Sequence, residues 1–404
     1  MGASVWPDVV WLNNLLAVLQ AAQLALLRLC HALGLTGDSH GQPAWPWARR
    51  IAGETLLIDP GLARQLAWSI GAMAFALLAL VLALAWRRGQ LASFGAGALA
   101  LILAPWPTPG LVLSPAAPTS FHVSPTRFAV ASIARGERVY TQHCAACHGD
   151  DGRGEGPLAA SLSRWPPTLA GPLLGRRADG ELFWHVVAGM RGRDGQPTMP
   201  AFGTTLGDAD VWAVIDYMKA LSAGTGARLQ GTWPTPLALP DLPVQCAGAA
   251  PRPLADWRGT QRVRLVAVDG HAALPMEDPR FLTLLVTPDG HAPAEVPQFR
   301  AGCVAATPEA WAVMARIAGV PAAALPGTAL LSDRQGWLRA RGAPGQAAWR
   351  ESDLLCTAGQ AGGQRQSADA RIDTPVDTPV DGLTALLLRM DAEPVRFVKG
   401  GFVH

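Results

Sequence analysis

Charged residues are scarce in this sequence. Only 16% of the 404 residues are charged, whereas 50% are hydrophobic, and the mean hydropathy is positive. This balance is unusual for a chain that is soluble along its whole length. The formal net charge is only +2, so the chain lacks the basic excess with which nucleic-acid-binding proteins neutralise phosphates. We therefore expect no nucleic acid as a partner.

Cysteine is also sparse, with six residues, too few for a dense disulfide framework. Two of them form the sequence Cys144-Ala-Ala-Cys147-His148. This spacing is the attachment signature of a c-type haem, in which each thiol forms a thioether to one vinyl group and the histidine ligates the iron. The motif therefore predicts one covalent haem c bound by Cys144, Cys147 and His148.

Two other uses of a Cys-x-x-Cys pair lack their supporting features here. A structural zinc site needs a second ligand pair with its own spacing, and none follows. A redox dithiol normally opens a helix after a thioredoxin-like strand, whereas residues 135–140 predict a short helix that runs into the motif. Haem attachment is therefore the favoured interpretation.

Long uncharged runs are almost confined to the first 120 residues. No charge occurs between Arg64 and Arg87, a length of helix that can cross a hydrocarbon core of about 30 Å. Trp68 and Trp86 stand near its ends, where aromatic belts are found. This run predicts a transmembrane helix, because a buried helix of that length would be unusual in a soluble core.

A weaker apolar run covers residues 8–28. Asn13, Gln20 and Gln23 share one side of a helix there, which suits a span packed against a neighbour or a helix lying in the membrane interface. The run lacks the basic start and small-residue cleavage site of a removable signal peptide. We therefore expect it to remain part of the membrane anchor.

A third apolar run, residues 91–113, meets Pro105, so a helix should end near Ala104 as a short span or a re-entrant piece. We predict a membrane anchor over residues 1–113 with two or three transmembrane helices. Three spans place the arginines of residues 28–64 outside, against the preference of basic residues for the cytoplasmic side. Two spans with a re-entrant third run would avoid this. We favour three spans. Haem is attached outside the cytoplasm, so the later domains should face the periplasm of a bacterial inner membrane.

A small all-α domain is expected at residues 126–224, between proline-rich linkers at 114–125 and 225–243. Gly136 is small enough to let a second helix approach the first closely. The expected elements are helices at 132–142, 179–190 and 208–221, with a glycine-rich turn at 150–157.

A second iron ligand is expected from a methionine on an irregular loop. Met199 lies between Thr198 and Pro200, and its soft thioether suits the iron of an electron-transfer haem. The alternative is that Met199 only fills the core. His185 and Met190 compete for the same role, but the apolar neighbours of His185 account for its helix as packing, and Met190 closes that helix. Met199 is therefore favoured.

These features resemble class I cytochromes c over residues 130–224. The resemblance rests on Cys144-Ala-Ala-Cys147-His148-Gly149, on Pro197-Thr-Met199-Pro200 and on the helix that ends in Asp216-Tyr-Met-Lys-Ala-Leu221. It implies covalent haem at Cys144 and Cys147, with His148 and Met199 as axial ligands. It also implies outer-sphere electron transfer without catalytic residues. The apolar residues before it look like the anchor of membrane-bound cytochromes.

Residues 244–404 predict a mixed α/β domain. Strands are expected at 262–268 and 281–287, a helix at 308–320 and a hairpin at 324–341. The segments Leu254-Ala-Asp-Trp-Arg-Gly259 and Leu325-Pro326-Gly327-Thr328 resemble membrane-tethered, periplasmic thioredoxin-like domains, in which the proline of the second segment is commonly cis.

This domain departs from that family where the active-site dithiol should stand. Residues 268–276 contain no cysteine, so thiol–disulfide exchange is not expected, and copper binding at that place is doubtful as well. Cys246, Cys303 and Cys356 can supply at most one disulfide, which we expect to be structural.

Together these observations lead us to expect a membrane-bound c-type cytochrome that passes single electrons between redox proteins in a periplasmic respiratory chain. It would be an electron carrier and not itself an enzyme. Two alternatives stay open: an oxidase-assembly or copper-handling protein with a redox-reporting haem, and the cytochrome subunit of a periplasmic dehydrogenase.

Overall fold

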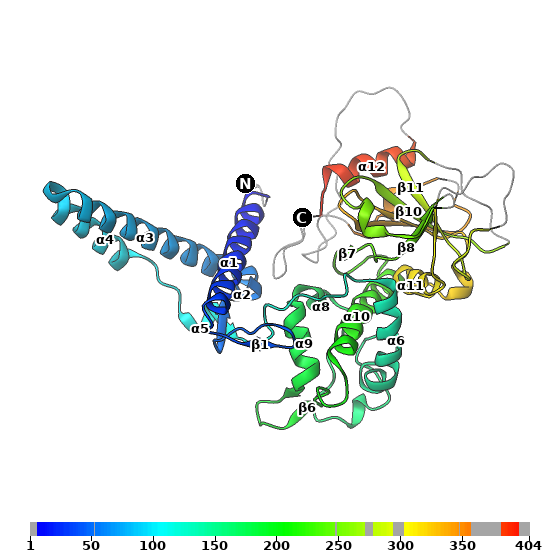
Figure 1. The fold of residues 1–404 in the computed structure, drawn as a ribbon, viewed down its shortest axis with the longest axis horizontal. Helices are drawn as coiled ribbons and strands as arrows, with labels where there is room; N and C mark the ends of the chain where they lie inside the picture. The colour runs from blue at the N-terminus through cyan, green and yellow to red at the C-terminus, as the bar shows by residue number, and fades with distance from the viewer. Residues whose placement is uncertain are drawn as a thin grey trace. The chain divides into compact units, whose positions relative to one another are not determined.

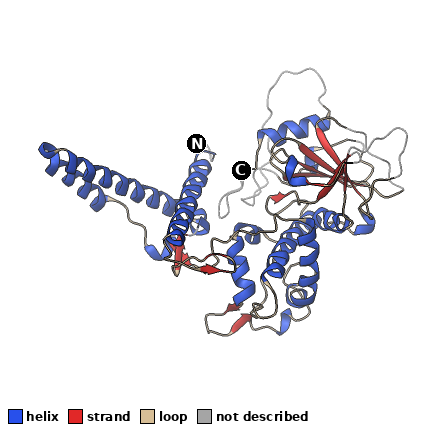
Figure 2. Cartoon of the chain, in the orientation of Figure 1, coloured by secondary structure: helices blue, strands red, loops and turns tan. Residues whose placement is uncertain are grey.

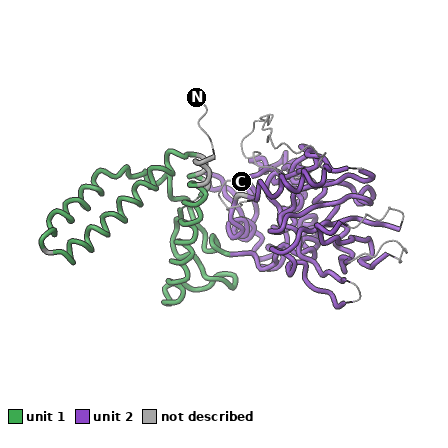
Figure 3. Tube along the Cα trace, turned by 90° about the horizontal axis from the view of Figure 1, so that it is seen from above, with its two compact units in different colours: residues 1–122, 398–402 green, residues 123–397, 403–404 purple. Residues whose placement is uncertain are grey.

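The chain forms two compact units in the computed structural model, one built on residues 1–122 and the other on residues 123–397 (Figure 3). The structure describes residues 6–51, 53–246, 249–270, 278–293, 303–346, 348–356 and 381–395.

Unit 1 is built mainly from helices (Figure 1). They are α1 (Trp6–Ala32), α2 (Gly53–Ile58), α3 (Pro60–Ala85), α4 (Gln90–Leu103) and α5 (Pro109–Val112). α3 begins where the Asp59 carboxylate accepts a hydrogen bond of 3.0 Å from the backbone N–H of Leu62, and Pro60 follows this cap. α4 packs closely on α3, because a Cβ added at Gly97 would lie 3.1 Å from the Cβ of Ala79.

Two segments of unit 1 are long and apolar enough to cross a membrane, Trp11–Ala32 and Pro60–Ala85. The third apolar run forms α4, which has 14 residues and ends at Leu103, as the proline at position 105 predicts. A helix of that length is about 21 Å long and falls short of a hydrocarbon core of about 30 Å. Of the three spans favoured from the sequence, two are therefore of spanning length, and the third is a shorter helix packed on α3.

Residues 114–122 belong to unit 1 and pack against its other residues, although the sequence predicted an extended linker there. Two short antiparallel ribbons lie in this region: β1 (Asp38–Ser39) with β2 (Gln42–Pro43), and β3 (Arg49–Ile51) with β4 (Leu113–Pro115). The Phe121 ring lies 4.5 Å from the Trp45 ring, and the backbone N–H of Trp45 donates to the Pro118 carbonyl at 2.8 Å. Burial of aromatic surface orders the segment despite its prolines.

The first part of unit 2 is helical. Its elements are α6 (Val130–His143), α7 (Ala145–His148), α8 (Pro172–Arg176), α9 (Asp179–Ala188), the ribbon β5 (Met190–Arg191) with β6 (Pro197–Met199), and α10 (Asp208–Leu229). α6 crosses α10 at Gly136, where an added Cβ would lie 2.0 Å from the Ala213 carbonyl oxygen. The close approach predicted for Gly136 is confirmed.

α10 continues for two turns beyond Leu221, where the sequence predicted its end. The extra residues are small, and Gly224 and Gly226 give them no apolar periodicity. Their small size serves a close contact, because a Cβ at Gly224 would lie 1.8 Å from the Arg316 carbonyl oxygen. Packing against α11 therefore extends a helix that local sequence would end.

The second part of unit 2 is an eight-stranded sheet (Figure 2) in the order β7-β14-β13-β10-β11-β12-β8-β9. β10 pairs in parallel with β11, and β11 with β12, whereas the other neighbours are antiparallel. The strands are β7 (Leu237–Ala238), β8 (Pro243–Cys246), β9 (Arg252–Pro253), β10 (Arg262–Ala267), β11 (Phe281–Val286), β12 (Cys303–Ala305), β13 (Ala329–Ser332) and β14 (Trp337–Gly342). The two strands, the helix and the hairpin predicted for this domain all form.

The sheet separates two apolar layers. Val263, Leu265 and Ala267 of β10 belong to the same buried cluster as α6, α10 and α11 (Glu309–Ala318). On the opposite side, strand residues including Leu331 pack with α12 (Gly382–Ala392). The main core therefore runs without a break from the helical part into the sheet.

Residues 225–243, predicted to be a proline-rich linker, belong largely to this core. The end of α10 and strand β7 occupy part of the segment. Trp233 is 2% exposed, and its indole N–H donates to the Ile317 carbonyl at 3.1 Å. Leu237 and Leu239 are also buried. The connection is therefore packed structure, because its apolar side chains fill the space between helices and sheet.

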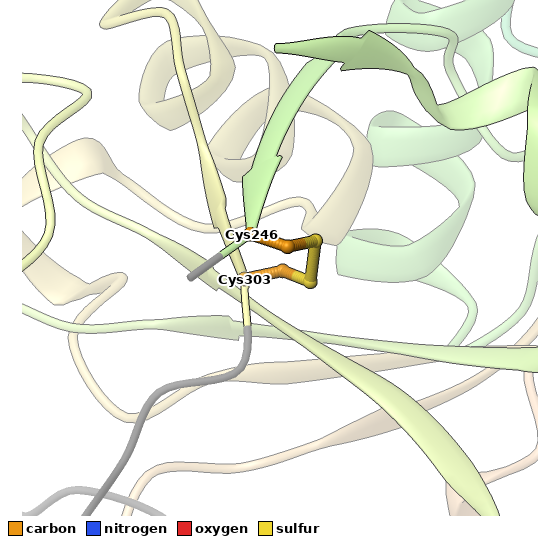
Figure 4. Close-up of a disulfide and its surroundings, with 2 residues drawn as sticks. All are labelled: Cys246 and Cys303. Carbon is orange, nitrogen blue, oxygen red and sulfur yellow. A yellow bond between two sulfur atoms is a disulfide. The ribbon is translucent and has the colours of Figure 1, made fainter. Parts of the chain in front are cut away.

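One disulfide joins Cys246 of β8 to Cys303 of β12, two directly paired strand residues (Figure 4). Cys356 is buried and belongs to no disulfide within the described residues. The prediction of at most one disulfide among these three cysteines is confirmed. Every described peptide bond is trans, so the Leu325–Pro326 bond differs from the cis form common in thioredoxin-like domains.

Candidate haem-binding site

Cys144, Cys147 and His148 lie on one helical turn directly after α6. The backbone N–H groups of Cys147 and His148 both donate to the Cys144 carbonyl, at 3.1 and 2.9 Å. Residues three and four apart share one face of a helix, so the two free thiols and the imidazole lie on the same side. The structure brings together the three residues that the sequence motif predicted.

The Cys144 thiol is poorly suited to disulfide exchange. Burial raises the pKa of Cys144 to about 12, and the neighbouring Cys147 adds to the shift. A thiol with such a pKa stays protonated at neutral pH, and the thiolate is the form that attacks a disulfide. The environment therefore argues against a redox dithiol at this position.

The His148 ring is suited to metal ligation. Burial lowers its pKa, although the Pro167 backbone carbonyl partly opposes the shift by favouring the protonated ring. The neutral imidazole, which this environment favours, is the form that binds a metal. Its Nδ1 atom is shielded from solvent and makes no well-aligned hydrogen bond within the described ranges.

The glycine-rich turn folds back over the Cys-x-x-Cys-His segment. The backbone N–H of Gly154 donates to the His148 carbonyl at 2.8 Å, and that of Gly156 donates to the Cys147 carbonyl at 3.1 Å. Gly154 has φ of +85°, and a Cβ added at Gly156 would lie 2.5 Å from the Ala146 carbonyl oxygen. Glycine is therefore required for the turn to bind the last carbonyls of α7.

A tyrosine that sequence reasoning missed supports the same segment. The Tyr140 hydroxyl donates to the Gly149 carbonyl at 2.7 Å, and its ring centroid lies 5.2 Å from that of Tyr217. Burial raises the pKa of Tyr140 well above its usual value. Available signals were the position of Tyr140, four residues before Cys144, and the fact that the chain has only these two tyrosines.

Met199 lies on a two-stranded ribbon, where the sequence predicted an irregular loop. β6 pairs with β5, so that Met199 stands directly opposite Met190. The backbone N–H of Gly192 donates to the Gln196 carbonyl at 2.8 Å and helps close the connecting turn. Met199 packs against the core, whereas Met190 is 37% exposed. Residues directly opposite in an antiparallel pair share a face.

His185 lies on α9, as predicted. Leu182, Phe183 and Val186 of this helix are buried in the core, which fits the expectation that the helix serves as packing. Burial is the main cause that lowers the His185 pKa.

The residues present fit a c-type haem. Two thiols and a neutral imidazole share one turn, and Met199 offers a thioether within the same domain. These are the donor types that c-type haem requires.

Comparison with known proteins agrees with this reading of the site. Residues 131–218 match the family "Cytochrome C oxidase, cbb3-type, subunit III". The chain is also similar to the cbb3-type cytochrome c oxidase subunit FixPc of Rhizobium leguminosarum bv. viciae, with 33% identity over 91 residues. That match covers 22% of this chain and 28% of the relative. Residues 131–218 therefore form a cytochrome c domain similar to cbb3-type subunit III.

A solved structure of the reducing HAO-like protein complex Kustc0457/Kustc0458 of Kuenenia stuttgartiensis also matches, with 20% identity. The match covers 31% of this chain and 59% of the other. Its TM-score is 0.22, so we draw no structural argument from it.

Proposed function

We propose that this protein is a membrane-anchored, monohaem c-type cytochrome that passes single electrons between redox proteins at the periplasmic face of a bacterial inner membrane. The observation that carries the proposal is the helical turn with Cys144, Cys147 and His148, inside a domain similar to cbb3-type subunit III. A haem in this site supplies exchange of one electron between its ferric and ferrous states.

The chain's own residues bind and orient that group. The Cys144 and Cys147 thiols would hold it covalently, and the neutral His148 imidazole would ligate the iron. Met199 would supply a thioether as a further ligand, which favours ferrous iron and would raise the reduction potential. Tyr140 and the turn around Gly154 fix the backbone on either side of His148.

The proposed lipid partner is supported by the surface of α3. Large apolar side chains along this helix are exposed, among them Leu77 at 64% and Leu84 at 74%. Contiguous exposed apolar surface on a helix of spanning length is typical of contact with lipid.

We propose that the sheet domain is thioredoxin-like and serves as a docking surface without dithiol chemistry. The parallel strands β12, β11 and β10, followed by the antiparallel β13–β14 hairpin, support this fold. The segment 268–276 lacks cysteine, and residues 271–277 lie outside the described residues.

The proposal is tested by replacing Cys144 and Cys147 with serine in the full-length protein. The haem signal after denaturing electrophoresis should disappear, while the protein still fractionates with membranes. Cys30→Ser, at a free cysteine of unit 1, is the matched control and should keep its haem. Covalent haem that persists in the double variant would contradict the proposed attachment.

The similarity to FixPc favours a terminal oxidase over a dehydrogenase as the redox partner. Affinity purification from native membranes should therefore recover oxidase subunits. Recovery of a dehydrogenase instead would support the alternative that this chain is a dehydrogenase cytochrome subunit. Stoichiometric copper binding by the purified full-length protein would support the copper-handling alternative.

A further inference from the structure

One arginine of the sheet domain contacts two side chains of the haem domain. Arg316 lies on α11, and its Nη2 atom is 2.6 Å from Oε1 of Glu137 on α6. The guanidinium carbon also lies 5.6 Å from the centroid of the Tyr217 ring on α10. These contacts combine an ion pair with a cation–π interaction.

Both contacts lead toward the haem-attachment turn. Glu137 stands seven residues before Cys144, which is about 10 Å along the helix axis. Tyr217 contacts Tyr140, whose hydroxyl holds the Gly149 carbonyl. Arg316 is therefore connected through two aromatic rings to the residue that follows His148.

Arg316 and Glu137 line a cavity that also reaches the haem-attachment turn. Glu137, Gly149, Asp150 and Arg316 line a cavity of about 740 Å³. Tyr217, Glu137 and Asp150 all act to raise the pKa of Arg316, which outweighs the opposing effect of burial. Arg316 thus remains a cation and interacts electrostatically with a residue two positions from His148.

The position of Arg316 is fixed by close backbone packing. Its carbonyl oxygen would lie 1.8 Å from a Cβ at Gly224, and the Gly224 carbonyl would lie 2.4 Å from a Cβ at Gly319. The neighbouring Ile317 carbonyl accepts the Trp233 indole N–H. The backbone of Arg316 therefore packs directly on the backbone of α10 at Gly224, which holds the base of this side chain in place.

We propose that Arg316 of the sheet domain neutralises Glu137 of the haem domain and so keeps this carboxylate from lowering the reduction potential of the haem. This inference rests on the proposed function. A ferric haem carries one more positive charge than a ferrous haem, so a nearby cation disfavours oxidation and a nearby anion favours it. In the pair the two effects offset each other. Arg316 and Glu137 do not contact the iron and act on it only through the electrostatic potential of their charges.

Redox titration of the haem absorbance in the full-length, detergent-solubilised protein tests this pair. Arg316→Gln leaves the Glu137 carboxylate uncompensated and should lower the potential, whereas Glu137→Gln should raise it. Arg316→Lys should stay near the wild-type value, and so should the double Gln variant. Both single shifts should shrink at high ionic strength, because mobile ions screen charges near solvent.

Arg280→Gln is the matched control, because this arginine pairs with Asp278 and donates to Thr384 on the α12 side of the sheet. Its potential should not move. Covalent haem is quantified first in every variant. If haem content is normal but the two single variants shift in the same direction or not at all, the charge-pair inference is overturned and the proposed function stands. If the wild-type protein carries no covalent haem, both are overturned.

Discussion

At the scale of single residues, the β5–β6 ribbon presents two thioethers on one face. Met199 packs on the core and Met190 is more exposed. We expect Met199→Ala to remove the sulfur-to-iron charge-transfer band of the oxidised protein and to lower the reduction potential, because a ligand that favours ferrous iron is lost. Visible spectroscopy and redox titration measure both effects.

Met190→Ala and His185→Ala are the matched controls and should keep the band. A band that survives in Met199→Ala contradicts the assignment of Met199. The Met190→Ala/Met199→Ala double variant then shows whether the opposite methionine supplies the thioether.

The Tyr140 hydroxyl gives a second prediction at this scale. Tyr140→Phe leaves the buried Gly149 carbonyl without its donor and should lower the free energy of unfolding by about 1–3 kcal/mol. Denaturant titration measures the loss. Tyr217→Phe is the control, because the Tyr217 hydroxyl makes no hydrogen bond within the described part of the chain, and its loss should be smaller. Equal losses in both variants would contradict this role.

The function of single residues could be predicted from the sequence where it depends on a short motif. The Cys144–His148 spacing is short, so the haem motif could be recognised without a fold. The Arg316–Glu137 pair joins residues 179 positions apart, and no local pattern indicates such a contact. The Tyr140–Gly149 hydrogen bond is harder to predict than the haem motif and easier than the Arg316–Glu137 pair. Its residues are close in sequence, but the bond depends on how α7 turns after α6.

At the scale of elements, α10 is longer than the sequence predicted. The small residues of its last turns allow close packing against α11, which extends the helix. Gly→Ala in a helix interior normally stabilises by about 1 kcal/mol. At Gly224 we expect the opposite sign, since the added Cβ would lie 1.8 Å from the Arg316 carbonyl oxygen and overpacking costs about 1–3 kcal/mol. Denaturant titration of Gly224→Ala decides the sign, and a gain in stability would contradict the close contact.

The ribbon that carries Met199 has a local hairpin signal in its sequence. Asp194-Gly195 stands between the two strands, Gly195 has φ of +78°, and an Asp-Gly pair between short extended runs is a typical hairpin signal. The flanking Pro197 and Pro200 favour an irregular loop instead, because proline cannot donate a backbone hydrogen bond to a ribbon. The strands β10 and β11 were easier to predict, because the leucine-rich run of β11 and the valines and leucine of β10 fit buried parallel strands.

At the scale of the whole molecule, the disulfide closes a long section of the sheet domain. Cys246 and Cys303 are separated by 57 positions. Loop-closure entropy for that separation gives a stabilisation of about 4 kcal/mol as an upper estimate. We therefore expect Cys246→Ser/Cys303→Ser to unfold at lower denaturant while keeping its covalent haem.

Adding a reductant during the denaturant titration should destabilise the wild-type protein and leave this double variant unchanged. A wild-type protein indifferent to reductant would contradict the disulfide. Its formation also requires an oxidising compartment, which agrees with the periplasmic location proposed for this part of the chain.

The order of the three parts along the chain could be predicted from the sequence. The packing of the helical part against the sheet part could not. Apolar runs, the haem motif and the strand pattern indicated an anchor, a helical domain and a sheet domain in that order. The proline-rich composition of residues 225–243 indicated a spacer, but Trp233 and Leu239 bury their side chains there. Composition reports the backbone preference of a segment, whereas burial depends on what the fold places beside it.

That packed connection has a kinetic consequence. Electron transfer between proteins requires an encounter followed by correct orientation of the two cofactors. A partner that docks on the sheet domain also determines the orientation of the haem domain, because one continuous core joins them. Under the proposed docking role, the haem domain would need no separate search for its partner, and a single docking event would define the tunnelling distance.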